Sequence, residues 1–138
     1  MATFNKFNSF VEALAEKVHN LGSDTLKVML TNSAPVATNT VKANLTEISA
    51  GNGYLAGGHT LAVSSSAQTS GTYRLITGDV TITATGAIGP FRYAAIYNDT
   101  ATNDELIGWF DYGSSITLQN GESFTIDTDP TNGIIQIV

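Results

Sequence analysis

The stretch from Gly89 to Ser115 constrains the fold of this chain more than any other part of it. It holds two runs in which aromatic and aliphatic residues alternate, 91–97 and 106–111, and a polar cluster at 98–104 between them. Alternation with a period of two predicts strands, and the polar cluster predicts a hairpin loop. Because both faces of these strands are apolar, one face must meet a second sheet. The other must meet another element or another copy of the chain.

The rest of the chain extends this pattern to a mainly β fold. Turn-rich segments separate short apolar runs at intervals of roughly 8–12 residues, which predicts an antiparallel β-sandwich or jelly-roll-like domain. We expect a single domain over residues 1–138, with its β part at 24–138. The expected strands are Thr25–Thr31, His59–Ser64, Tyr73–Thr77, Val80–Thr85, Phe91–Tyr97, Glu105–Phe110, Ser115–Leu118, Ser123–Thr128 and Ile134–Val138.

Several connecting segments also carry signals. Residues 41–48 are expected to form a short helical turn, and 64–71 a loop. Asn120-Gly121 is a signal for a tight hairpin, and Asn132-Gly133 is a candidate for a second one. The segment Ile134–Val138 is so apolar that we expect it to be paired and buried, in its own sheet or against a neighbouring subunit.

One amphipathic α-helix is expected over residues 5–21. Asn5 or Asn8 is placed to cap its start and Gly22 to end it, with His19 as a cation in the last turn. We expect the apolar stripe to cover a sheet of the same chain, and a contact outside the chain is the alternative. The stripe consists of Phe7, Phe10, Val11, Leu14 and Val18, at helical spacing.

The charge balance excludes one class of partner. The chain has 138 residues, of which 42% are hydrophobic but only 13% charged, about half of the usual ~25%. Six basic against 12 acidic residues give a net charge of −6. The six basic residues are scattered, so we exclude nucleic-acid binding, which needs clustered positive charge. A neutral polar surface favours packing between copies, because a buried charge needs a partner.

Residue usage also bears on the compartment. There is no cysteine, which excludes disulfides and thiolate metal sites. The first ten residues lack the apolar run of a signal peptide, and no segment approaches the ~18 apolar residues of a membrane span. We therefore expect a protein that is made in a cytoplasm and has no membrane partner.

The motifs associated with catalysis are weak. His19 and His59 are the only histidines, and no G-x-S-x-G motif accompanies the serine run. Gly51–Ala56 fits a loose G-x-G-x-x-A pattern, but no helix start follows it. We interpret it as a loop with positive φ angles in which Tyr54 folds back as an anchor. We expect no enzyme and no cofactor.

Two further constellations leave alternatives open. Asp99, Asp104 and Glu105 share one polar loop, and Asp127 and Asp129 share another. We expect solvated turn residues, with calcium as the alternative, although neither loop has the EF-hand pattern; we therefore predict no metal. Beside them in the sequence, Trp109, Asp111 and Tyr112 form the one group that suits stacking on a sugar. We expect these three to be strand and core residues instead.

Four segments together form one recognisable pattern: DTLKVMLTNSAP (24–35), EISAGNGYLAGG (47–58), GPFRYAAIYND (89–99) and LIGWFDYGSSITLQNGESFTIDTDPTNGI (106–134). This pattern resembles one family, the small virion structural proteins of tailed bacteriophages. The resemblance implies a structural component of the virion and brings no catalytic residues. Within a virion, we expect a capsid decoration or cement protein: a small β domain that binds the outer shell as a homo-oligomer, most simply a trimer, and clamps the major capsid protein.

Two alternatives to capsid decoration stay open at this point. One is a tail component, such as a tube, adaptor or fibre-base module, with 36–50 or 51–58 as a stacking loop. The other is a carbohydrate- or receptor-binding module. For the expected interfaces between chains, the candidate residues are Phe7, Phe10, Val11, Leu14, Tyr54, Tyr97, Trp109, Tyr112, Ile135 and Ile137.

Overall fold

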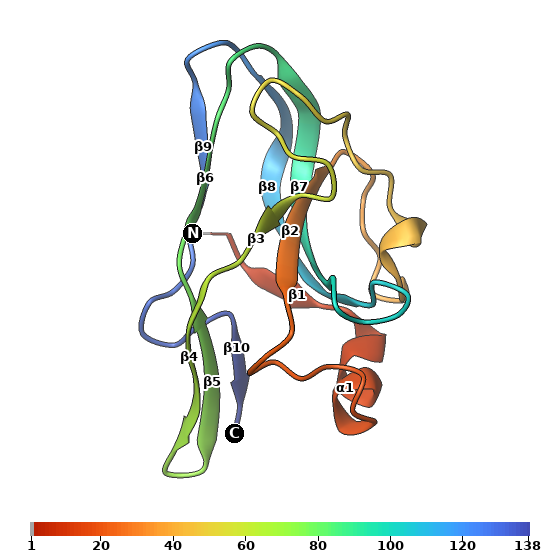
Figure 1. Cartoon of the computed structure of the whole chain (residues 1–138). Helices are drawn as coiled ribbons and strands as arrows, with labels where there is room; N and C mark the ends of the chain where they lie inside the picture. The colour runs from red at the N-terminus through yellow and green to blue at the C-terminus, as the bar shows by residue number, and fades with distance from the viewer. Residues whose placement is uncertain (1) are drawn as a thin grey trace.

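Three antiparallel sheets and one α-helix make up the computed structural model, which describes residues 2–138 (Figure 1). Strands account for 47% of the chain and helical turns for 8%, so the predicted mainly β fold is confirmed. The largest sheet has the order β1 (Phe4–Lys6), β8 (Leu106–Leu118), β7 (Ile88–Asn98), β2 (Leu26–Thr31) and β3 (His59–Thr60). A second sheet has the order β10 (Ile135–Ile137), β5 (Thr72–Thr77) and β4 (Val63–Thr69), and a third pairs β6 (Val80–Thr83) with β9 (Ser123–Ile126).

The β7–β8 hairpin that the sequence predicts forms the centre of the largest sheet. Ala94 lies opposite Phe110, and Ala95 lies opposite Trp109. Because neighbouring residues of a strand point to opposite faces, the two pairs supply different cores. Ala94 and Phe110 belong to the main core, and Ala95 belongs to a second, smaller one.

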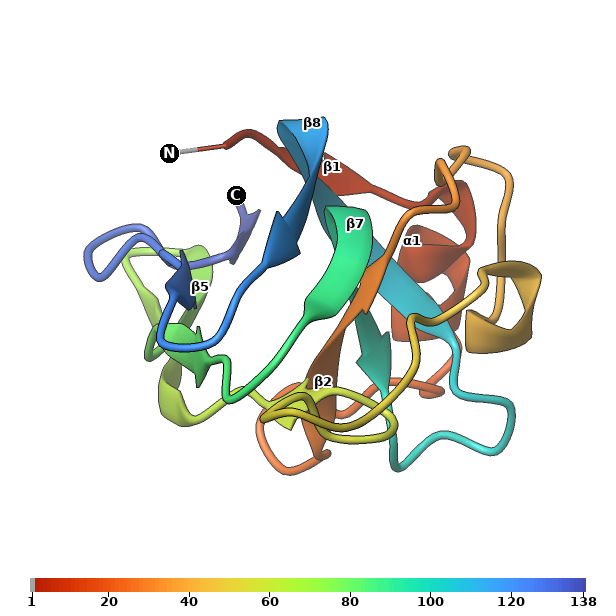
Figure 2. The same ribbon diagram turned by 90° about the horizontal axis from the view of Figure 1, so that it is seen from above.

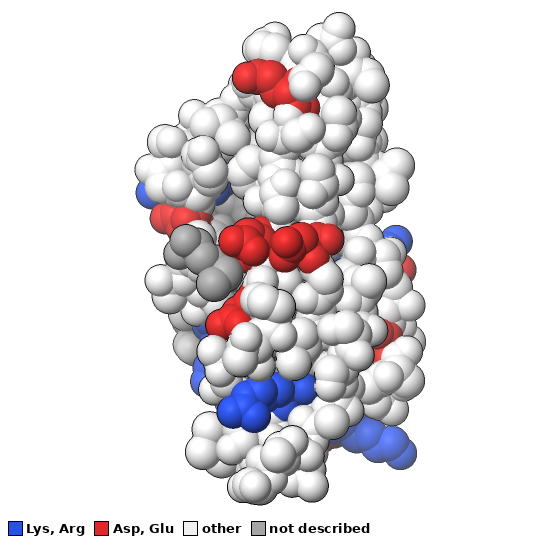
Figure 3. Space-filling model, turned by 90° about the vertical axis from the view of Figure 1, so that its left-hand side faces the viewer, with Lys and Arg blue, Asp and Glu red and all other residues white. Residues whose placement is uncertain are grey.

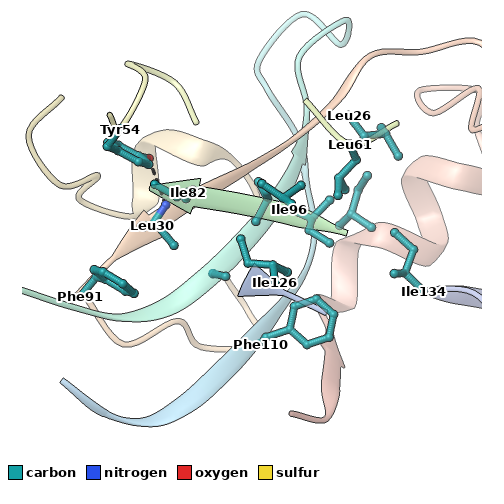
Figure 4. Packing of buried hydrophobic residues seen from close by; sticks show 14 of the residues in the cluster. Leu26, Leu30, Tyr54, Leu61, Ile82, Phe91, Ile96, Phe110, Ile126 and Ile134 are labelled. Atoms are coloured by element: carbon teal, nitrogen blue, oxygen red, sulfur yellow. Dashed lines mark hydrogen bonds between the residues drawn. The ribbon is translucent and has the colours of Figure 1, made fainter. Parts of the chain in front are cut away.

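The main core fills the space between the largest sheet and the two shorter ones (Figure 2). Leu30 from β2 and Ile96 from β7 face Ile82 from β6 and Ile126 from β9 (Figure 4). All four side chains are at most 5% exposed, and burial of each stabilises the fold by roughly 1.5–3 kcal/mol. The strands are therefore held together mainly by aliphatic packing.

The second core covers the opposite face of the largest sheet. Its buried members are Phe7, Met29, Leu45, Ala95, Tyr97 and Leu106, with Trp109 packed against them. Leu45 comes from the segment that contains the short 3₁₀ helix η1 (Lys42–Asn44), which is drawn in gold beyond the sheet in Figure 2. The helical turn expected in this segment is confirmed. The second apolar face of the hairpin is thus covered by the chain itself and needs no second copy.

The helix is shorter than the sequence predicts, so the expected bounds of 5–21 are wrong. α1 spans Asn8–Ala15, and residues 4–6 form the edge strand β1 beside β8. The helix ends because Lys17 takes a positive φ of 69°. The Val18 N–H then bonds the Ala13 carbonyl and the Lys17 N–H bonds that of Leu14, which is a Schellman motif without glycine.

Three expectations about strands are also wrong. The sequence places most of residues 63–69 in a loop, but they form β4. A two-residue turn at Ser70-Gly71, with positive φ angles of 51° and 83°, pairs them with β5. The two runs 105–110 and 115–118 belong to one bulged strand, β8. The turn at Asn120-Gly121 does not close a hairpin, because β9 pairs with β6, and Asn132-Gly133 precedes a strand that pairs with β5.

Candidate functional site: an apolar groove beside the helix

An apolar groove runs between α1 and β10, and we call it the α1–β10 groove. Its walls exist because α1 turns Phe10 into the main core while β10 turns Ile135 inward. Val11, the residue after Phe10, is 50% exposed, and Ile137, two residues after Ile135, is 45% exposed. Its lining residues are Phe4, Lys6, Phe10, Val11, Leu14, Ala15, Ile134, Ile135, Gln136, Ile137 and Val138.

The ten interface candidates from the sequence divide into two groups. Phe7, Phe10, Tyr54, Tyr97 and Ile135 are buried within the chain. Their side chains pack in the two cores of the chain, and Phe10 and Ile135 also line the α1–β10 groove.

The other five candidates reach the surface to different extents. Leu14 and Trp109 are half-buried, and Val11, Tyr112 and Ile137 are exposed. Val11, Leu14 and Ile137 come together in the α1–β10 groove, whereas Tyr112 lies in a separate hollow.

Trp109 and Tyr112, expected as neighbours in a sugar site, lie on different parts of the structure. The Trp109 ring packs against Phe7 in the second core, with the ring centroids 4.6 Å apart. Tyr112 packs edge-on against Phe124 at 5.5 Å, in the separate hollow that Asp111 also lines. The structure therefore brings only Asp111 and Tyr112 together.

Asp111 is held by a neighbouring strand. Arg92 donates from Nε to Oδ1 at 2.8 Å and from Nη2 to Oδ2 at 3.1 Å, and the Gly113 N–H also donates to Oδ1. These hydrogen bonds favour the charged carboxylate and lower the pKa of Asp111. The pair fixes the bulged part of β8 against β7, a structural task that uses most of the capacity of this carboxylate.

The loop at 51–58 is organised by Glu47, which the sequence did not single out. One carboxylate oxygen accepts the Tyr54 hydroxyl at 2.7 Å and the Gly57 N–H at 2.8 Å, and the other accepts Lys42 Nζ at 3.2 Å. Tyr54 in turn accepts the Leu30 N–H at 3.0 Å and is 2% exposed. Burial, followed by the bond to Glu47, raises the pKa of Tyr54. The expected anchor role of this tyrosine is confirmed, and the bond to Leu30 is drawn in Figure 4.

The histidines occupy structural positions in different loops. His19 lies beyond the end of α1 and is 4% exposed, so its expected role as a cation in the last helical turn is wrong. Burial lowers its pKa, although Glu105 and Asp24 act in the opposite direction. His59 lies near the ring of Tyr54, at 5.7 Å, and accepts the Leu55 N–H at 3.5 Å; burial lowers its pKa as well.

The acidic loops mainly bond their own backbone. Asp129 accepts the N–H groups of Thr131 and Asn132, and these bonds lower its pKa. Asp99 pairs with Lys27 at 3.3 Å. Within residues 2–138, no three His, Asp or Glu side chains are placed to hold a metal ion. In the same part of the chain, no helix has the length and apolar character needed to cross a membrane.

Comparison with known proteins finds no matching family model, no matching curated protein and no matching solved structure.

Proposed function

We propose that this chain is a non-enzymatic structural protein of a tailed-phage virion, and that it decorates the outer shell as an oligomeric cement protein. The observation that carries the proposal is the α1–β10 groove, where Val11, Leu14 and Ile137 gather apolar side chains at one place on the surface. Apolar surface of this kind marks protein–protein contacts. The proposed partners are further copies, in a trimer, and the major capsid protein.

The distribution of charge supports packing of this kind. Figure 3 shows a face on which large areas carry no charged side chain. The edge strand β4, Val63–Thr69, has no charged residue either. An uncharged strand edge is open to pairing with another chain, because charged residues are one of the devices that prevent it.

The four segments that carry the resemblance form the centre of the structure. They contain β2, β7, β8 and β9, together with the loop that Glu47 organises. The resemblance thus concerns the central strands, and the α1–β10 groove lies outside these segments apart from Ile134. The resemblance supports a fold shared with the proposed family, and the groove supports the proposed contacts with other chains.

We also propose that the sheets form a sandwich of jelly-roll type. The arrangement that supports this is a five-stranded sheet on one side and two shorter sheets on the other, with one core between them (Figure 2). Strands that are neighbours in a sheet are often distant in sequence, as in the pair of β6 and β9, which is typical of Greek-key connections.

The proposed mechanism is stabilisation by mass action. A protein that binds the assembled shell and not its dissociated parts shifts the equilibrium toward the shell. Many copies, each with modest affinity, then act together through multivalency. No single site has to be strong, which agrees with a shallow apolar surface that lacks buried charges.

The test is a cryo-EM reconstruction of the phage particle whose genome encodes this protein, with the copies of the protein counted. We expect hundreds of copies at local three-fold positions of the shell, with the α1–β10 groove in a contact. A few copies to some tens along the tail axis would overturn the decoration role in favour of a tail component. Absence from the particle would overturn the virion role as a whole.

A further inference from the structure

Asn98, at the end of β7, uses its complete hydrogen-bonding capacity inside the protein. Its side chain is 0% exposed. The carbonyl oxygen accepts the N–H groups of Thr100 at 2.9 Å and Ala101 at 3.2 Å. The amide nitrogen lies 2.7 Å from Asp24 Oδ2 and 3.0 Å from His19 Nδ1. Backbone N–H groups only donate, so the carbonyl must face them, and the orientation of the amide is fixed.

This orientation determines the protonation state of His19. Both hydrogens of the Asn98 amide are directed at acceptors, one at Asp24 and one at His19 Nδ1. Nδ1 must therefore carry a lone pair. The imidazole is neutral, with its hydrogen on Nε2, which is buried and has no hydrogen-bond partner among residues 2–138.

We propose that His19 is an acid-sensitive latch. The neutral ring connects residues 17–20, which follow α1, to the β7–β8 loop through its hydrogen bond with Asn98. Protonation at Nδ1 breaks this connection.

The latch opens because protonation places two donors face to face. A hydrogen on Nδ1 points at the NH₂ group of Asn98. The amide cannot turn to offer its oxygen instead without breaking both bonds to Thr100 and Ala101. Two outcomes are then open. Either the His19 ring moves away from Asn98, or the Asn98 amide turns and the loop after β7 loses the hydrogen bonds of Thr100 and Ala101. A buried donor without an acceptor destabilises the closed arrangement.

The titratable groups around His19 come from its own segment and from three others. Glu105 precedes β8 and Asp24 precedes β2, and both carboxylates favour a protonated ring. Lys17 of the same segment lines the hollow with its positive charge, and Tyr73 of β5 lines it as a hydroxyl bonded to Ser66. Burial of the ring outweighs the two carboxylates and lowers the pKa. The closed latch is therefore the state at neutral pH.

The segment that the latch holds supports one wall of the α1–β10 groove. The His19 ring lies 5.4 Å from that of Phe10 on α1, and Leu14 lines both the groove and the hollow around His19. Opening the latch removes a support from the end of the helix and weakens assembly through the groove at acidic pH. This consequence for assembly rests on the proposed function; the latch itself does not.

The experiment is an NMR pH titration of the full chain with ¹⁵N-labelled histidine. At about pH 7.5 we expect the His19 signals of a ring protonated at Nε2. As the pH falls, the amide signals of Thr100 and Ala101 should shift with the same midpoint as His19, below 6.5, and lose protection from hydrogen exchange. A ring protonated at Nδ1, or loop amides that stay in place while His19 titrates, would overturn the latch.

Two variants separate the latch from other titrations. His19→Gln offers an amide oxygen that accepts the Asn98 hydrogen and does not titrate, so the transition of Thr100 and Ala101 should disappear. His59→Gln is the matched control and should retain it. If His19→Gln does not fold, the wild-type titration alone decides. The mass of the wild-type protein at about pH 7.5 tests the proposed assembly separately, because the latch operates in a monomer too.

Discussion

The rings of Phe7 and Trp109 lie 4.6 Å apart and are tilted by 45°, and this pair joins the start of the helix to the centre of the largest sheet. Phe7 precedes α1, and its N–H bonds the Ile107 carbonyl of β8. The second core is thus closed by a residue that sequence periodicity placed on the helical stripe. The pair also explains why the second apolar face of the hairpin needs no partner chain.

Trp109→Ala should destabilise the fold and leave no separate binding defect. Removing a large ring that packs on Phe7 costs about 3 kcal/mol, since the second core cannot refill the space. Denaturant unfolding measures this change. Tyr112→Ala is the control, because Tyr112 is 55% exposed and should cost less than about 1 kcal/mol. Equal stability of Trp109→Ala and the wild type would contradict the second core.

Gly58→Ala should be far more harmful than Gly121→Ala, although the two glycines share nearly the same φ, 91° and 90°. A Cβ at Gly58 would lie 2.1 Å from the Val28 carbonyl oxygen, whereas one at Gly121 meets nothing within 4 Å. The backbone strain of about 1–3 kcal/mol is common to both variants. The difference in unfolding free energy therefore isolates the clash with β2, and equal losses would show that the loop does not pack against that strand.

The parts of the fold that the sequence predicted are those in which local pattern and tertiary contacts agree. Strand β2 and the β7–β8 hairpin have alternating apolar residues, and burial on one or both faces follows directly from that alternation. A short helical turn within 41–48 was predicted as well, and so was the anchor Tyr54, because glycines allow the positive φ angles of the loop around it.

The remaining parts depend on contacts between distant residues. The serines of β4 have little strand preference, and pairing with β5 through Ser70-Gly71 makes them a strand. Phe4–Lys6 pair with β8 because Phe4 packs against Phe110 at 5.4 Å, a contact across the whole chain. Neither is visible in a local window of sequence.

The site was predicted only in part for the same reason. Val11 and Ile137 were named as apolar surface, but their meeting in one groove depends on the pairing of β10 with β5. The hydrogen bond between Gly57 and Glu47 joins residues 10 positions apart, and the one between His19 and Asn98 joins residues 79 positions apart. The only sequence signal for the Glu47 contacts is a single carboxylate before a glycine-rich loop. The sequence carries no signal for the contact between His19 and Asn98.

Stability should rise with pH in the range just below 6.5. Burial lowers the pKa values of His19 and His59 in the folded state, so the unfolded chain binds more protons in this range. The stabilisation is complete above about pH 6.5 and is lost as the pH falls through the folded-state values. Denaturant unfolding at about pH 7 and about pH 5.5 measures the slope.

Variants then assign this pH dependence to its source. His19→Gln and His59→Gln should each reduce the slope, and together they should nearly remove it in this range. An undiminished slope in the double variant would assign the effect to carboxylates instead.

Ile135→Ala and Ile137→Glu should separate folding from assembly at two positions of one strand. Ile135 is 6% exposed and belongs to the main core, so its truncation should cost about 2–4 kcal/mol of stability. Ile137 is 45% exposed and lines the α1–β10 groove. A glutamate at position 137 should leave the free energy of unfolding within about 1 kcal/mol of the wild type. It should, however, lower the molar mass of the assembly in solution.

Light scattering at micromolar concentration provides that mass. We expect an oligomer, most simply a trimer, for the wild type and a monomer for Ile137→Glu, because a carboxylate in an apolar contact loses its hydration without gaining a partner. Val11→Glu, on the opposite wall of the groove, should have the same effect, and Tyr112→Glu outside it should not. A wild-type monomer would remove self-association from the proposal, and an oligomer unaffected by both groove variants would place the contact on another surface, with the β4 edge as the next to test.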